Sequence, residues 1–169
     1  MSGISSFLSR KEVKPSFKTY GVDAMSAMAQ GLFCTLLVGT ILNTIGAQFH
    51  IGFLTAHVVT IGGVGYSIGS VACAMVGPAM AVAIGSALNA PALVLFTLVP
   101  VGYATNAMGG AGGPFAVYLI AIIAAEAGKI VSKETNIDIL VTPIVILLVG
   151  IGAAFIVAGA PTPAISELC

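Results

Sequence analysis

The sequence predicts an all-α fold, a polytopic transmembrane helical bundle of about five spans with one re-entrant or broken segment. Three observations lead to this prediction. Hydrophobic residues make up 58% of the 169 residues and charged residues only 7%, whereas a soluble domain carries about a quarter. The mean hydropathy is +1.10, and no Asp, Glu, Lys or Arg occurs from Ala24 to Ala125. So little charge could not cover a globule in water, so we expect the lipid bilayer to be the solvent.

The same composition argues against several classes of protein. The formal net charge is zero and there are only six basic residues, which does not favour nucleic acid as a partner. The three cysteines, Cys34, Cys73 and Cys169, are scattered without a CxxC pair, so neither a disulfide framework nor a metal site is expected. No cofactor and no catalytic residue is assigned.

Residues 1–23, "MSGISSFLSRKEVKPSFKTYGVD", form a polar segment in which aromatic side chains alternate with basic ones. We expect this segment to be cytoplasmic. Two interpretations stay open, a stretch that lies on the membrane surface and a basic flank that only fixes topology. The basic residues are Arg10, Lys11, Lys14 and Lys18.

The expected transmembrane domain covers 24–159. Its first span, 24–49, is long enough to cross a hydrocarbon core of about 30 Å. Residues 51–65 are apolar but short and contain a Gly-rich break, so they are either re-entrant or broken, or part of a neighbouring span. The second span is 66–88, where Pro78 is the expected kink.

The third span, 90–108, is expected to be interrupted at Pro100. The fourth is 113–131 and the fifth 137–159, in which Pro143 is a candidate break near the start; a short tail, 160–169, follows. Spans two to four are rich in Gly, Ala and Ser, which predicts close helix packing.

The lysines predict the topology. By the positive-inside rule the N-terminus is cytoplasmic. Lys129 and Lys133 should be cytoplasmic too, which requires an even number of crossings before them. Four spans satisfy this condition, but counting 51–65 as a separate crossing would not. We therefore expect 51–65 to be a re-entrant segment or an extension of a neighbouring span.

The sharpest local motif is "NAMGGAGGP", residues 106–114. Its glycines and proline cannot sustain a helix, and irregular backbone at membrane depth is tolerated only where protein buries it or where it lines a cavity. The alternatives are a substrate-facing broken element and a tight turn on the outer side. The candidate binding residues are Asn106, Gly109, Gly110, Gly112 and Gly113.

His50 and His57 are seven residues apart, so they share one face if the segment between them is helical. They are candidates for a proton relay or for hydrogen bonds to a sugar. Packing or interface roles are the alternative, because no third ligand lies nearby for a metal.

The stretch "AEAGKIVSKETNIDILVTP", residues 125–143, gathers five of the twelve charged side chains. Most of them are explained by a cytoplasmic connector. Glu126 adjoins the apolar run, where an ionisable residue is a functional candidate. Lys129 lies three residues further on the same helical face and is its expected ion-pair partner.

Residues 106–150, "NAMGGAGGPFAVYLIAIIAAEAGKIVSKETNIDILVTPIVILLVG", together with the opening span "YGVDAMSAMAQGLFCTLLVGTILNTIG", resemble a family of phosphotransferase-system enzyme IIC membrane proteins. This is the second IIC family, which includes the putative perfringolysin regulator. The resemblance runs from about Tyr20 to Gly152.

This resemblance implies a multi-pass subunit in a bacterial plasma membrane. It would bind and translocate a sugar, working as a homo-oligomer with cytoplasmic IIA and IIB components. Family members continue through further spans, whereas this chain ends soon after the fifth, so it looks like a half-length protein. No phosphate-accepting His or Cys can be assigned, so enzymatic activity is left open. The alternatives are a membrane regulator or sensor of toxin expression without transport, and an inactive fragment.

Overall fold

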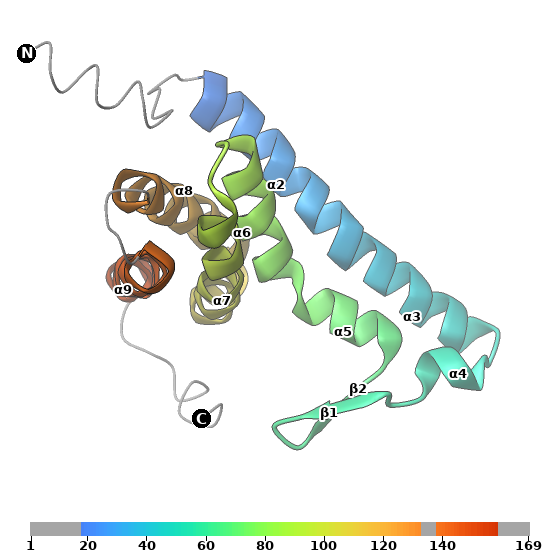
Figure 1. Cartoon of the computed structure of the whole chain (residues 1–169). Helices are drawn as coiled ribbons and strands as arrows, with labels where there is room; N and C mark the ends of the chain where they lie inside the picture. Colours follow the sequence, from blue (N-terminus) through green and yellow to red (C-terminus); the bar gives the residue numbers. More distant parts are fainter. Residues whose placement is uncertain (1–17, 133–137, 159–169) are drawn as a thin grey trace, which may run out of the picture.

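The computed structural model describes residues 18–132 and 138–158. Expectations that concern 1–17, the connector at 133–137 and the tail at 160–169 lie outside the described residues. The described chain is mostly helical, which confirms the predicted class, and it contains one small two-stranded sheet. Figure 1 shows how these elements are arranged.

The first helix is longer than the expected span. It runs without a gap through Lys18–Gln48 and has 31 residues, which is about 46 Å at the usual rise. A hydrocarbon core is only about 30 Å thick, so this helix exceeds what one perpendicular crossing needs. It consists of η1 (Lys18–Asp23), α2 (Ala24–Leu32), η2 (Phe33–Leu37) and α3 (Val38–Gln48).

Residues 51–65 are a broken segment, as one of the alternatives expected, and not a helical extension of a neighbouring span. They form one short helix, α4 (Gly52–Thr55), and a hairpin of β1 (Val59–Ile61) and β2 (Val64–Tyr66). The strands are antiparallel with Ile61 opposite Val64. The two glycines between them have φ of 57° and 82°, as a tight two-residue hairpin turn requires. The segment therefore makes no crossing of its own, consistent with the parity argument.

The second expected span is a bent pair of helices. Ser67 accepts a hydrogen bond from the Ser70 amide and begins α5 (Ile68–Ala74). The chain bends by 52° before α6 (Val76–Ala87). The bend falls just ahead of Pro78, which has no N–H for the preceding turn and whose ring crowds the carbonyl four residues back.

Three long helices complete the fold. They are α7 (Ala92–Gly109), α8 (Gly113–Val131) and α9 (Asp138–Ala158), and a single 3-10 turn, η3 (Gly110–Gly112), joins the first two. The expected interruptions at Pro100 and Pro143 are wrong, because both prolines lie inside continuous helices. A long apolar helix tolerates one missing N–H when neighbours support it on both sides.

Within the described residues, three helices are long and apolar enough to cross a membrane, or four if the bent pair counts as one span. These are the first helix, α7 and α8, with α5–α6 as the fourth. The expected fifth span corresponds to α9. Its apolar stretch Leu140–Ile156 is shorter than the others.

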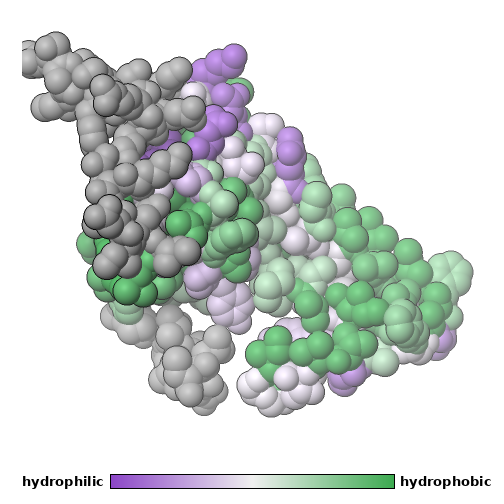
Figure 2. All heavy atoms as spheres, in the orientation of Figure 1, coloured by the Kyte–Doolittle hydropathy of each residue, from purple (hydrophilic) through white to green (hydrophobic). Residues whose placement is uncertain are grey.

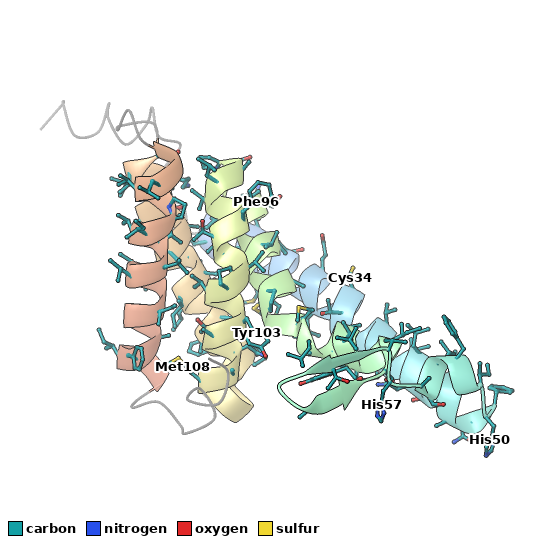
Figure 3. The ribbon with its side chains drawn as sticks, turned by 60° about the horizontal axis from the view of Figure 1, so that its bottom comes forward. Cys34, His50, His57, Phe96, Tyr103 and Met108 are labelled. Atoms are coloured by element: carbon teal, nitrogen blue, oxygen red, sulfur yellow. The ribbon has the colours of Figure 1, made fainter. Side chains whose placement is uncertain are left out.

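The molecule has two parts. We call α2, α6, α7, α8 and α9 the bundle, because these helices pack on one another, and α3, α4, the hairpin and α5 the arm. The arm extends away from the bundle in Figures 1 and 3. The core lies in the bundle, where the largest fully buried side chains are those of Met80, Ile84, Leu88, Leu98, Ile120 and Ile146.

Glycines let the helices approach closely, as predicted for the small-residue spans. A Cβ added at Gly77 of α6 would lie 2.4 Å from the Gly102 carbonyl oxygen of α7, and one at Gly102 would lie 2.5 Å from that of Gly77. Gly39 and Gly69 form a similar mutual contact between α3 and α5. The backbones touch at these points, which only glycine permits.

Candidate functional site

The structure distributes the predicted site residues over three regions. Glu126 lies near the end of α8, the Gly-rich turn lies at its beginning, and His50 and His57 belong to the arm. Figure 3 shows both histidines on the arm, far from Met108 at the end of α7. The predicted residues therefore do not form one site.

Glu126 and Lys129 form the expected ion pair. The Lys129 Nζ lies 2.8 Å from Glu126 Oε1, and the two side chains are only 4% and 16% exposed. Besides Lys129, the Tyr20 phenol is the described neighbour that interacts with the Glu126 carboxylate, and no further described group donates to either oxygen. A buried carboxylate keeps acceptor capacity for further donors, since ionised oxygens offer several lone-pair directions.

Lys129 also connects α8 to α6. Its Nζ donates a hydrogen bond of 3.1 Å to the Leu88 carbonyl oxygen, and Leu88 is the residue that ends α6. The last carbonyls of a helix lack partners and carry partial negative charge. The ammonium group therefore satisfies the α6 terminus and the carboxylate together.

Tyr20 joins the start of the first helix to the same place. Its phenol lies beside the Glu126 carboxylate, while Tyr118 of α8 donates a hydrogen bond to the Tyr20 carbonyl oxygen. The start of the first helix, the end of α6 and the end of α8 thus meet around one ion pair. The helix ends that carry Lys18 and Lys129 therefore lie at the same end of the bundle. An even number of crossings between the two lysines, such as the expected four, requires this arrangement.

The Gly-rich motif is a tight turn in which η3 joins two antiparallel helices. Gly110 has a φ of 51°, and a Cβ at Gly113 would lie 2.6 Å from Asn106 Oδ1. Asn106 also packs against Gly77 of α6. These contacts favour the tight-turn alternative, and substrate binding by this motif stays a prediction.

The histidines do not share a helical face. His50 follows α3 with a φ of 52°, and His57 lies between α4 and β1 beside Gly65. Only the four residues of α4 are helical between them, so the condition for a common face is not met. Both side chains are exposed, and a binding role for either stays a prediction.

The sequence-based reasoning missed a polar groove between α2 and α6. It has a volume of about 380 Å³. Asp23, Ser26 and Gln30 follow one another at helical spacing on the first helix, a signal that could have been found in the sequence. The remaining lining residues are Ala27, Ala83, Ser86 and Ala87.

The comparisons with known proteins identify the family. Searches of curated proteins and of solved structures found no match. The model of the family described as "Phosphotransferase system, EIIC" matches residues 22–167, which is most of the chain and includes the described bundle and arm. This multi-pass membrane protein belongs to the phosphotransferase system EIIC family.

Proposed function

We propose that the protein is the membrane-embedded subunit of a phosphoenolpyruvate-dependent sugar phosphotransferase system, in which it binds a sugar and carries it across a bacterial plasma membrane. Family membership over residues 22–167 is the observation that carries this proposal. In this role the chain works as a homo-oligomer with cytoplasmic IIA and IIB components, and the IIB component phosphorylates the sugar.

The placement of charge supports a cytoplasmic N-terminus. Lys18, Glu126 and Lys129 lie on helix ends that meet at one end of the bundle, and cationic side chains favour the cytoplasmic side. The Gly-rich turn at the other end of α8 then faces outward. A IIB component would meet the end that carries Glu126 and Lys129.

Glu126 is the residue that we propose for sugar binding. Its carboxylate is paired with Lys129 at 2.8 Å and lies beside the Tyr20 phenol, and its oxygens keep acceptor capacity for further donors. Sugar hydroxyls are donors, and a charged acceptor in a low-dielectric site binds a donor more strongly than a neutral acceptor does.

The test is sugar binding and uptake by the purified chain in lipid vesicles, with radiolabelled D-glucose, D-fructose and N-acetyl-D-glucosamine as probes. We expect saturable binding of at least one of them. Glu126→Gln should reduce uptake at least tenfold, because a charge-assisted hydrogen bond is replaced by a neutral one. Thr44→Ala is the control, since Thr44 is exposed on α3 and donates only to the Thr40 carbonyl oxygen.

Two results would contradict the proposal at different levels. Folded wild-type protein that neither binds nor moves a sugar would contradict transport and favour a membrane regulator. Uptake that is unchanged in Glu126→Gln would leave transport intact and remove Glu126 from the mechanism.

A further inference from the structure

The groove between α2 and α6 is a second polar feature, apart from the Glu126 ion pair. Asp23, Ser26 and Gln30 line one wall and Ser86 of α6 lies opposite. The alanines Ala27, Ala83 and Ala87 make up the rest of the lining, so no bulky side chain fills the space. A volume of about 380 Å³ falls in the lower part of the range of small-molecule sites, roughly 300–1,000 Å³.

This polar face stands out from the rest of its helix. The other exposed faces of the first helix carry large apolar side chains, which suit lipid. Asp23, Ser26 and Gln30 are exposed on this face, and polar side chains of this kind are unfavourable against lipid unless they find partners. The exposed apolar residues of this helix are Val22, Met25, Phe33, Leu36, Leu37, Val38, Ile41 and Ile45.

The groove residues also differ from the other polar side chains of the first helix. Thr35, Thr40 and Thr44 each donate to a carbonyl oxygen of their own helix, at 2.8 to 2.9 Å, so their hydroxyls are satisfied where they lie. Within the described residues, no such bond is made by the side chain of Ser26, Gln30 or Ser86. These donors and acceptors point to a ligand with complementary hydroxyl groups.

The chemistry of the lining specifies the kind of ligand. A carboxylate, a carboxamide and two hydroxyls offer acceptors and donors for a polyhydroxylated molecule. Among the residues that the structure describes, no cationic side chain lines the groove, and Asp23 repels anions. The groove therefore suits a neutral sugar and disfavours a sugar phosphate.

We propose that this groove is a second sugar subsite, formed by Asp23, Ser26, Gln30 and Ser86, which prefers unphosphorylated over phosphorylated sugar. The inference rests on the proposed function, since it assumes that the chain handles sugars. Asp23 follows Tyr20 by one helical turn, so the subsite opens at the same end of the bundle as Glu126. A site that rejects the phosphorylated sugar at this end would not be blocked by the product of the system.

The first experiment measures equilibrium binding to the full chain in vesicles, with the three labelled sugars as probes and their 6-phosphates as competitors. Gln30→Ala should weaken binding of the sugar about tenfold, the loss expected for a hydrogen bond with a net value of about 1.4 kcal/mol. Asp23→Asn should weaken sugar binding and raise the relative affinity for the 6-phosphate. Thr40→Ala, another exposed polar position on the same helix, should bind as wild type does.

The second experiment places a reporter in the groove. Cys34, Cys73 and Cys169 are replaced by Ser, and Ser86→Cys is labelled with a maleimide with and without sugar. We expect sugar to slow labelling at Ser86→Cys several-fold and to leave labelling of the control Thr44→Cys unchanged.

The outcomes separate the two proposals. If wild type binds sugar and neither the groove variants nor the labelling respond, the subsite is overturned and the proposed function stands. If wild type binds no sugar, both are overturned. A disulfide between two copies of Ser86→Cys would mean that a second copy covers the groove, and that also overturns the subsite.

Discussion

The bundle and the arm are both apolar in sequence but are held together in different ways. In the bundle, large side chains such as Met80, Ile84 and Ile120 are fully buried. In the arm, the buried residues of α3 and α5 are the glycines Gly39, Gly46 and Gly69, and α4 and the hairpin have none. Figure 2 shows hydrophobic surface spread over the arm. The bundle has a hydrophobic core of its own, whereas the arm has none and needs lipid or another protein surface to cover its apolar side chains.

The backbone of the hairpin limits which environment, lipid or protein, can lie against the arm. Two strands of three residues each leave both edges unpaired within the described residues. Unpaired backbone edges are not tolerated against lipid chains, so the hairpin has to lie at the membrane surface or against protein. An apolar cleft of about 350 Å³ separates it from α7, lined by Ile61, Met75, Pro78, Val99, Pro100 and Tyr103.

The largest expected effect is on close helix contact in the bundle. Gly77→Val should prevent recovery of folded protein, because its Cβ would lie 2.4 Å from the Gly102 carbonyl oxygen and both backbones are fixed by the core. The measurement is the monodisperse fraction in detergent. Gly152→Ala, with nothing within 4 Å, is the control and should be neutral or slightly stabilising.

The matched change in the arm sharpens the comparison. Gly39→Val would meet the Gly69 carbonyl oxygen at 2.7 Å, yet α3 and α5 have no large buried side chains to hold them. We expect α5 to move aside and the bundle to stay folded. Equal loss for Gly39→Val and Gly77→Val would show that the arm is as rigid as the bundle.

The next effect concerns the buried ion pair. Lys129→Met leaves the Glu126 carboxylate without its cation. Because the Glu126 side chain is only 16% exposed, the change should destabilise the bundle by about 3 kcal/mol. The double variant with Glu126→Gln should recover part of that loss. Thermal unfolding in detergent measures both, and a double variant as unstable as Lys129→Met alone would contradict the pairing.

A smaller effect is expected from the interhelical hydrogen bond of the arm. Ser67 Oγ donates to Asn43 Oδ1 at 2.9 Å, so Asn43→Ala should loosen α5 from α3 by about 1 kcal/mol. Hydrogen exchange of α5 amides reports this change. Thr44→Ala, one residue further along, is the control, and unchanged α5 exchange in Asn43→Ala would show that glycine packing alone holds the arm.

The smallest effect is local to the hairpin. Gly63 has a φ of 82°, so Gly63→Ala should cost about 1 kcal/mol through backbone strain. We expect faster exchange at the strand amides and no change in the bundle. Gly52→Ala, which has open space and no positive φ, should leave the hairpin as it is; altered bundle stability in Gly63→Ala would indicate a direct coupling of the two parts.

The sequence predicted the helices best where the bilayer imposes a strict length. Residues 113–131 were expected as a span and form α8 with those bounds. The fifth, expected at 137–159, forms α9 (Asp138–Ala158). The Glu126–Lys129 pairing also followed from spacing, because residues three apart on a helix are neighbours.

The hairpin was missed although two glycines between β-branched residues carry its signal. In so apolar a chain a short strand and part of a membrane helix look alike, because periodicity does not separate short apolar runs. The predicted helix breaks at Pro100 and Pro143 were wrong for a related reason. Whether Pro100 breaks a helix depends on the support from neighbouring helices, which sequence does not contain.

By itself, the sequence determined that lipid is the solvent, where the long helices α7, α8 and α9 lie and which charges share a helical turn, because each of these depends on composition or on neighbours along the chain. The tertiary structure alone decided that Lys129 caps α6 at Leu88, that Gly77 meets Gly102 and that Gln30 and Ser86 line the same groove. Those contacts join residues that are distant in sequence, so they exist only once the helices have packed.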